Sequence, residues 1–565
     1  MQPARPTFPR FSAAGSPASA RRGGAAAVAL GLCVLGGGCF VGDTAVDPPT
    51  DAFYYPTGLV RSRGGSTLYV TNSDFDLQYN GGTVLALDLK TIRDLKLNPL
   101  LDALRQVGSG KTVADACATV ITATNSNTIL NPGPCLAIPL LTATGEPPPS
   151  ATIGAFASGA VLVQPEDATR DARLFIPVRG DPSITFLDVD NDTTSRKFTR
   201  RLTCTNAGTP SLPGVRCSDD HLIGMDPFES TRAIRLPTEP VGIAASEDGT
   251  AIVVAHQTES SVSLSIDDPR DAKPTLQFVL GNLPAGPTEV VTVPIPKLIK
   301  ARVERPTSAA DAIDYQRGFL VTYRAAPVLD LLRVRKDESG TARPYLSRSS
   351  ETVISVNADG KDSRGIALDS SKRQDCEAAC AGGADACLVA CVKIPIDVYI
   401  ANRAPPSLLV GRLETTTIPE DDAKPTGAFD RVLITDSVPL SFGASKVTVG
   451  NVIDAEGQLR RRVFAAAFDS RLIFSYDPQA RAIDAFFRSG RGPHGLASDA
   501  DEQAAITGVS GDAQQTGHAF LYVGHFTDSY LGVIDLDMRH PETFGTMFAS
   551  VGTPTPPKGS KGSQK

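Results

Sequence analysis

The chain has 565 residues, of which 41% are hydrophobic and 21% charged, and its formal net charge is −7. This apolar content is enough for a globular core, and the acidic balance excludes the charge distribution of a nucleic-acid-binding surface. The 50 glycines and 43 prolines, with no tryptophan, indicate many turns, as a protein of short β-strands requires.

The N-terminal segment has the pattern of an export signal. Arginines without acidic residues precede the apolar run "GGAAAVALGLCVLGGGC", which is too short to span a bilayer as a stable helix. The sequence therefore predicts a signal peptide over residues 1–38. The end of this run, "LGGGC" at Leu35–Cys39, resembles the lipobox of bacterial lipoproteins. The resemblance implies a diacylglyceryl group on Cys39; a signal peptide with an incidental cysteine is the alternative.

The residues next to this cysteine and at the C-terminus predict two flexible segments. Residues 39–51 have the composition of a short polar tether. By the same resemblance, Phe40 in place of Asp implies an outer-membrane lipoprotein of a Gram-negative bacterium, held to the membrane by its lipid anchor. Residues 551–565 end in "PPKGSKGSQK" and predict a disordered tail.

One strand-rich unit recurs between these ends. Its first copy has "PTGLV" from Pro56, a glycine-rich turn, "LYVTN" from Leu68 and "TVLALDL" from Thr83. Further clear copies begin at Pro240, Ser363 and Pro493, and weaker copies occupy residues 172–190, 317–334 and 461–478. Seven copies at intervals of tens of residues predict small sheets that bury their apolar faces by stacking in a closed ring.

The pattern P-x-G-[IL]-A, LYV-[AT]-[NH] and V-x-[LVI]-[IL]-D-L resembles the YVTN-type seven-bladed β-propeller repeat family over residues 52–550. The resemblance implies an all-β fold of seven blades. About 70 residues separate successive copies, against roughly 40–50 in common propeller repeats. We therefore expect loop insertions at about residues 90–150, 269–310 and 371–393.

Eight cysteines follow the lipidation site, and an exported protein is expected to oxidise them. Two predicted bridges, Cys117–Cys135 and Cys204–Cys217, each close a local loop. In "CEAACAGGADACLVAC", cysteines four residues apart share a helix face, which predicts a helical hairpin with nested bridges. These are Cys376–Cys391 and Cys380–Cys387. A Cys₄ metal site is the alternative, but export favours disulfides, so we assign no metal.

The strand ends of the repeat predict a ligand-binding rim. The residue after the first proline or serine begins strand one, and an Asn or His ends strand two, so both lie at one rim of the ring. Propeller ligands usually lie over the central channel, where the blades converge. The predicted rim residues are Thr57, Asn72, His256, Arg364, Asn402, His494 and His525. The alternative is that Asn and His here only bind turn backbone.

These observations predict a membrane-anchored exported lipoprotein whose propeller is a binding or scaffolding module. Its partner would be an unknown protein or a small polar ligand, and Arg364 favours an anionic or polyhydroxyl one. We assign no catalytic residue and no cofactor. The alternative is a propeller-type enzyme, a lyase, lactonase or dehydrogenase-like protein with a site at the top of the channel.

Overall fold

The protein is described here from a computed structural model. The structure describes residues 46–120, 123–140, 145–165, 170–193, 200–205, 213–230, 232–268, 271–304, 313–336, 343–354, 361–380, 382, 385–499 and 519–557. The predicted signal peptide, Cys39 and most of the tether and tail lie outside these residues. Within the described residues, none of the helices combines the length and hydrophobicity needed to cross a membrane.

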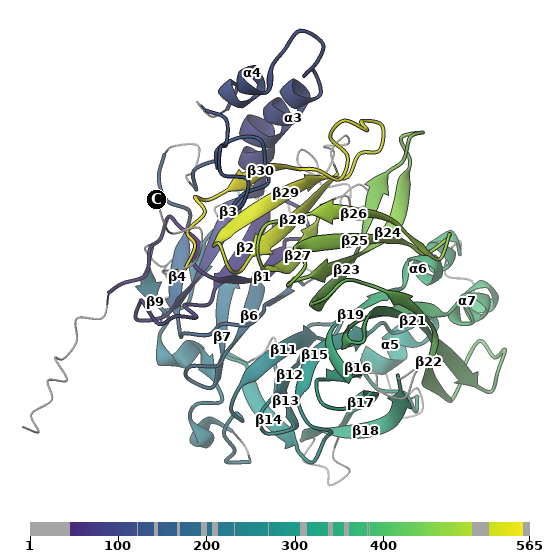
Figure 1. The fold of residues 1–565 in the computed structure, drawn as a ribbon. Helices are drawn as coiled ribbons and strands as arrows, with labels where there is room; N and C mark the ends of the chain where they lie inside the picture. The colour runs from purple at the N-terminus through teal and green to yellow at the C-terminus, as the bar shows by residue number, and fades with distance from the viewer. Residues whose placement is uncertain are drawn as a thin grey trace, which may run out of the picture. The chain divides into compact units, whose positions relative to one another are not determined.

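Seven sheets follow one another along the chain and form a seven-bladed β-propeller (Figure 1), which confirms the predicted fold class. The first two blades have five strands each. Blade 1 comprises β1 (Pro56–Arg61), β2 (Thr67–Asn72), β3 (Gly82–Asp88), β4 (Ser150–Ile153) and β9 (Val215–Arg216). Blade 2 comprises β5 (Val161–Val163), β6 (Ala172–Val178), β7 (Ser183–Val189), β8 (Leu202–Thr203) and β10 (Leu222–Ile223).

Blades 3 to 7 are four-stranded antiparallel meanders. Blade 3 has β11 (Pro240–Ala245), β12 (Ala251–His256), β13 (Ser261–Ile266) and β14 (Thr275–Leu280). Blade 4 has β15 (Pro287–Val293), β16 (Gly318–Tyr323), β17 (Val328–Lys336) and β18 (Pro344–Val353). Blade 5 has β19 (Lys361–Asp369), β20 (Ile396–Ala404), β21 (Pro406–Ile418) and β22 (Gly427–Pro439). Blade 6 has β23 (Ala444–Ile453), β24 (Leu459–Ala467), β25 (Leu472–Asp477) and β26 (Ala482–Arg488). Blade 7 has β27 (Pro493–Ser498), β28 (Phe520–His525), β29 (Tyr530–Asp535) and β30 (Met547–Val551).

The core lies between neighbouring blades. Along a strand, successive side chains point to opposite faces of the sheet, so each blade has two faces to bury. One cluster joins Phe464 and Phe487 of blade 6 to Tyr530 and Ile534 of blade 7. All four side chains are almost fully buried. Stacking therefore supplies the apolar contacts that a single four-stranded sheet lacks.

The ring closes through contacts between blades 1 and 7, each of which consists of strands from its own end of the chain. The Tyr55 backbone N–H donates to Ser529 Oγ at 3.0 Å. The first insertion adds two buried ion pairs across the same junction, Arg93–Asp499 at 3.2 Å and Arg105–Asp535 at 3.2 Å. Because each arginine is paired with a buried carboxylate, these contacts hold the insertion against blade 7.

The insertions agree with the sequence at two of three places. The first lies between β3 and β4 and contains α2 (Leu89–Ile92), η1 (Arg93–Leu97), α3 (Asn98–Leu104) and α4 (Val113–Ala118). The hairpin of α6 (Ser371–Ala379) and α7 (Asp385–Val392) lies between β19 and β20, as predicted. The expected insertion at 269–310 is wrong in part, because it contains the propeller strands β14 and β15. Only α5 (Lys297–Glu304) and its flanks form an insertion there. The remaining short helices are η2 (Asp219–His221) and η3 (Pro227–Glu229).

All four predicted disulfides are present. They join Cys117 to Cys135, Cys204 to Cys217, Cys376 to Cys391, and Cys380 to Cys387. The last two are nested between α6 and α7, as the four-residue spacing predicted. The sulfurs of Cys380, Cys387 and Cys391 lie within 4.8 Å of one another. All three belong to disulfides, so they do not offer the thiolates that a zinc site requires.

Candidate functional site

A β-bulge at the start of strand one shapes the rim of the channel. In six of the inner pairs, β1–β2, β11–β12, β15–β16, β19–β20, β23–β24 and β27–β28, the register shifts near the start of strand one. In blade 2, Ala157 pairs with Val178 as an isolated bridge at the corresponding place. A bulge leaves a residue unpaired and redirects its side chain. We call the first unpaired residue at this place in each blade the bulge residue. The seven are Thr57, Ser158, Val241, Thr288, Arg364, Ser445 and His494.

All seven bulge residues line one cavity of about 300 Å³ at the axis, which we call the axial pocket. In six blades a residue at or just after the end of strand two adds a second layer, because its side chain also faces this cavity. These second-layer residues are Ser73, Arg179, Gln257, Arg403, Phe468 and Phe526. Phe75, Phe156, Ala157 and Lys446 complete the lining. Every blade therefore contributes to the pocket.

Three predicted rim residues, Thr57, Arg364 and His494, belong to this lining. The other four, Asn72, His256, Asn402 and His525, do not, and each is at most 1% exposed. They lie at or, for Asn402, near the end of strand two, where side-chain alternation points them into the blade rather than toward the channel. The predicted rim is therefore corrected by one residue at strand two, to the residue that follows each predicted one.

The buried strand-two ends have structural partners. Asn72 Nδ2 donates to Thr83 Oγ1 at 3.0 Å, and Asn402 Nδ2 donates to the Pro405 carbonyl oxygen at 2.8 Å. His525 Nε2 accepts from the Gly490 N–H at 3.0 Å, and its ring stacks on Tyr530 at 4.2 Å between centroids. Burial lowers the pKa of His525 to about 3, so its imidazole is neutral at neutral pH.

His256 resembles His525 in its environment. Its Nε2 lies 2.8 Å from Ser263 Oγ, and burial lowers its pKa to about 4. Burial in an apolar interior disfavours the charged imidazolium, which explains both shifts. The sequence left open the alternative that histidines at these strand ends only bond neighbouring turn and strand groups. The structure agrees with this alternative for His256 and His525.

The bulge residues link neighbouring blades. Thr57 Oγ1 donates to the Ala157 carbonyl oxygen at 2.9 Å, Ser158 Oγ to that of Val241 at 2.8 Å, and Thr288 Oγ1 to that of Ser363 at 2.7 Å. His494 Nδ1 lies 3.0 Å from the Thr57 carbonyl oxygen and therefore donates to it, because a carbonyl only accepts. These bonds join blades 1 to 2, 2 to 3, 4 to 5 and 7 to 1. They fix the floor of the pocket.

Small residues let the inner strands approach this closely. A Cβ built on Gly242 would lie 2.5 Å from the Thr288 carbonyl oxygen, and one on Gly365 would lie 3.0 Å from Lys446 Cα. The residue after the bulge is glycine in five blades, and Glu289 and Lys446 in blades 4 and 6. These two side chains form an ion pair. The pair connects two blades that are not neighbours and occupies the space that the glycines leave.

The polar side of the pocket is cationic. Arg179, Arg364, Arg403 and Lys446 line it, and none of the described lining residues carries a carboxylate. Each cation is nevertheless held by an acidic residue outside the lining: Arg179 by Glu239 at 2.8 Å, Arg364 by Asp362, Arg403 by Asp469, and Lys446 by Glu289. A guanidinium has five N–H donors, so one carboxylate leaves donors for a ligand.

The electrostatics at the floor follow from these cations. Burial, together with the charges of Lys446 and Arg364, lowers the pKa of His494 to about 4. His494 is therefore neutral at neutral pH, with its proton on Nδ1 and a lone pair on Nε2. The ring offers an acceptor, and the positive charge at the floor belongs to the arginines and Lys446.

Four phenylalanines also line the pocket. Phe75 and Phe526 lie 5.3 Å apart between centroids, Phe75 and Phe156 5.8 Å, and Phe468 and Phe526 6.1 Å. Most of these rings meet edge to face or tilted, an arrangement that aromatic quadrupoles favour. Phe75 is 50% exposed. Sequence reasoning missed this layer because the phenylalanines lie in loops or just after a strand, outside the repeated motif.

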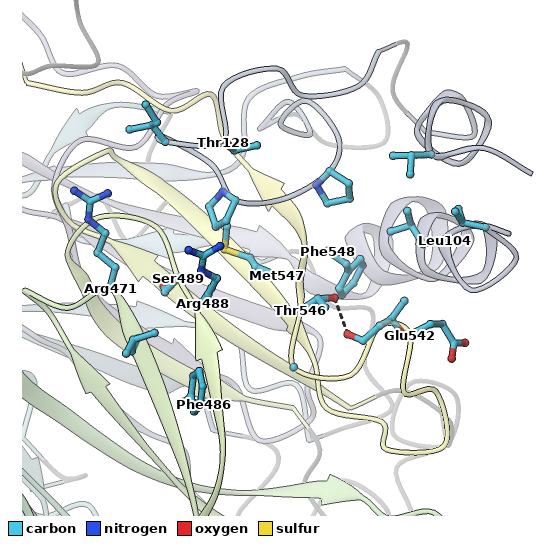
Figure 2. Close-up of a pocket in the computed structure, with 18 of the residues that line it drawn as sticks. Leu104, Thr128, Arg471, Phe486, Arg488, Ser489, Glu542, Thr546, Met547 and Phe548 are labelled. Atoms are coloured by element: carbon cyan, nitrogen blue, oxygen red, sulfur yellow. Dashed lines mark hydrogen bonds between the residues drawn. The ribbon is translucent and has the colours of Figure 1, made fainter. Parts of the chain in front are cut away.

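A larger cavity lies away from the axis, between blades 6 and 7 and the first insertion (Figure 2). Its volume is about 1050 Å³, and apolar side chains such as Leu104, Phe486 and Phe548 form much of its wall. Figure 2 shows Arg471 and Arg488 toward one end and Glu542 toward the other. Two blades and an insertion build it, and its charged lining residues are of both signs, whereas those of the axial pocket are all cationic.

Comparison with known proteins names no family. No protein-family model and no curated protein match the chain. Among solved structures, hydrazine synthase of Kuenenia stuttgartiensis is 11% identical with a TM-score of 0.43, covering 87% of this chain and 98% of its own. The periplasmic gluconolactonase of Pseudomonas aeruginosa is 11% identical with a TM-score of 0.39, covering 78% and 86%. A Lactobacillus plantarum protein is 9% identical with a TM-score of 0.38, covering 78% and 87%. These values assign no ligand or activity to this chain.

Proposed function

We propose that the propeller is a binding module for a small anionic ligand and that the axial pocket is its site. One observation carries this proposal: four cationic side chains line the pocket, and no described lining residue is acidic. Small-molecule sites combine an enclosed cavity with a few converging polar groups, and the pocket has both.

The cations are suited to bind rather than to react. Arginine presents planar N–H donors that match the two oxygens of a carboxylate or the oxygens of a phosphate. The acidic partners outside the lining orient the guanidinium groups of Arg179 and Arg403 before a ligand arrives. Inter-blade hydrogen bonds hold the floor, so little conformational entropy is lost when a ligand binds.

The test measures binding to the purified full-length protein by calorimetry. The probes are phosphate, gluconate and benzoate at low ionic strength. We expect at least one of them to bind, and Arg364→Ala to weaken that binding about tenfold, the effect of removing one charged hydrogen-bond partner. Arg412→Ala is the matched control, because Arg412 pairs with Glu414 on a blade strand outside the pocket. If no probe binds, or both variants weaken binding equally, the proposal fails.

The proposed setting is a lipoprotein anchored through Cys39. The lipobox-like run at Leu35–Cys39 supports it, and four disulfides are consistent with folding in an oxidising compartment. On this proposal the protein belongs to the cell envelope, at the outer membrane. Cys39→Ala should move the protein from the membrane fraction to the soluble fraction. A wild-type protein that is already soluble and lacks the mass of acyl chains would contradict the anchor.

A second candidate function, a propeller-type enzyme, rests on His494. Its Nε2 lone pair is free of the Thr57 contact, and the residue lines the pocket, so the ring could accept a proton or bind a metal. The lowered pKa makes it a weak base, which favours the binding role. Metal analysis separates the two: stoichiometric metal that is lost in His494→Ala would support the enzyme.

A further inference from the structure

Two chemically distinct sets of side chains line the axial pocket, which we call its apolar half and its cationic half, and their contrast restricts the ligand further than charge alone. The apolar half is formed by four phenylalanines, Phe75, Phe156, Phe468 and Phe526. None of these side chains carries a hydroxyl or an indole N–H. A ligand group that touches them gains burial and ring contacts but no hydrogen bond.

The floor between the halves has few free donors. The hydroxyls of Thr57, Ser158 and Thr288 already donate to carbonyl oxygens of neighbouring blades. His494 Nδ1 is used in the same way, with the Thr57 carbonyl. These groups can accept a hydrogen bond from a ligand but do not offer a proton. Of the other lining residues, Ser73 and Gln257 carry neutral donors, and the charged donors are those of the cationic half, in particular Arg364 and Lys446.

His494 is close to members of both sets. Its ring centroid is 6.1 Å from that of Phe526. Lys446 and Arg364 line the same pocket, and their charges contribute to the lowered pKa of its imidazole. A ring stacked near Phe526 can therefore place an attached anionic group near Arg364 and Lys446 within one cavity of about 300 Å³.

We infer that the ligand is a small planar aromatic carboxylate, with its ring against Phe75 and Phe526 and its carboxylate at Arg364 and Lys446. This inference rests on the proposed binding function and names its ligand class. Phe75 is half exposed, and a flat ring would extend the edge-to-face array that Phe75 already forms with Phe156 and Phe526.

A polyhydroxyl acid fits this arrangement less well. Its hydroxyls would lie over phenylalanine rings that offer neither donor nor acceptor, and each hydroxyl would lose its water without a replacement. A neutral aromatic would contact the rings but offer no negative charge to the donors that the four cations have left. The pocket is therefore expected to discriminate against both.

Calorimetry on the full-length protein with four probes tests the inference. Benzoate should bind about tenfold more tightly than gluconate, which has the charge without the ring, and than benzamide, which has the ring without the charge. Cyclohexanecarboxylate should bind more weakly than benzoate, because it keeps the charge and apolar area but cannot form edge-to-face contacts.

Two variants test separately how the apolar half and the cationic half contribute to binding. Phe526→Leu should weaken benzoate several-fold and leave gluconate unchanged, and Arg364→Ala should weaken both carboxylates. Phe228→Leu is the matched control for the first variant, because Phe228 is 89% exposed and lies outside the pocket lining. If gluconate binds as tightly as benzoate and Arg364→Ala weakens both, the inference about the ligand class is wrong and the proposed function stands. No binding of any carboxylate or phosphate would overturn both.

Discussion

Two rings of side chains surround the axis at the same rim, and they differ in burial and in hydrogen-bond partners. The bulge residues line the axial pocket, whereas the strand-two ends are buried inside the blades. Histidine occurs in both rings. His494 binds the Thr57 carbonyl of the next blade and faces the cavity, whereas His525 is fully buried and stacked on Tyr530. One residue type thus has two roles, and position in the register decides which.

The physical cause is local. A strand-two end follows regular alternation, so its side chain points into the interface between blades. A bulge residue has no paired partner, and the kink of the bulge directs its side chain toward the channel. Residues that adjoin one another at the ends of strands one and two therefore differ in role: one ring fills the interfaces between blades, and the other lines the pocket. Substitutions in the two rings should separate effects on stability from effects on the pocket.

The largest expected difference is between the losses of protein stability caused by His525→Ala and by His494→Ala. His525→Ala removes a stacked ring and leaves the Gly490 N–H without its acceptor in the core, which should lower the free energy of unfolding by about 3 kcal/mol. His494→Ala loses one inter-blade hydrogen bond at a half-buried site and should cost about 1 kcal/mol. Urea denaturation measures both. Equal losses would show that the two rings are not distinct.

The buried ring should also make stability depend on pH. The folded-state pKa of His256 is about 4, below the usual value of 6.5, because the side chain is buried. Between these values the unfolded chain binds a proton that the folded chain excludes, so stability rises with pH across this window. The slope from one such group is about 1.4 kcal/mol per pH unit. His256→Gln should reduce the measured slope by about one proton between pH 4 and 6.5, and leave it unchanged above pH 7. An unchanged slope would place the imidazole in water.

The bulge residues should contribute smaller amounts to the free energy of unfolding, through their hydrogen bonds to neighbouring blades. Thr288→Val keeps the shape of the side chain but removes the donor to the Ser363 carbonyl, and should cost about 1 kcal/mol. Val241, the one bulge residue in the ring with an apolar side chain, offers the reverse test. Val241→Thr would add a hydroxyl where the Thr57, Ser158 and Thr288 pattern has one, and should stabilise slightly. Thermal unfolding of the two variants compares them, and opposite signs are expected.

The smallest stability effect is expected at Arg364. Its partner Asp362 belongs to the same strand, β19, and the pair is partly exposed, so Arg364→Ala should change the free energy of unfolding by less than about 0.5 kcal/mol. The same variant is expected to weaken anion binding about tenfold. A large loss of stability with unchanged affinity would place Arg364 among the structural residues instead.

Part of this arrangement could be predicted from the sequence. The repeated motif is clear enough to locate four strand-one starts and their bulge residues. These copies begin at Pro56, Pro240, Ser363 and Pro493. The weaker copies contained strands two and three of their blades, so their first strands were missed. In blade 4, Pro287 keeps the motif's proline, but Glu289 replaces its glycine, and in blade 6 neither is present. Ser158, Thr288 and Ser445 were missed for this reason.

The sequence alone determined the number of blades, the hairpin between β19 and β20 and the four disulfide pairs, because these depend on local spacing: strand alternation, turn residues and cysteines four apart on a helix. Only the tertiary structure decided which polar strand ends line the axial pocket. That choice depends on a one-residue bulge that leaves no distinct mark in composition. It also decided the character of the pocket, because Phe75, Phe526, Arg364 and Lys446 are distant in the chain and acquire a shared chemistry only when seven blades close around one axis.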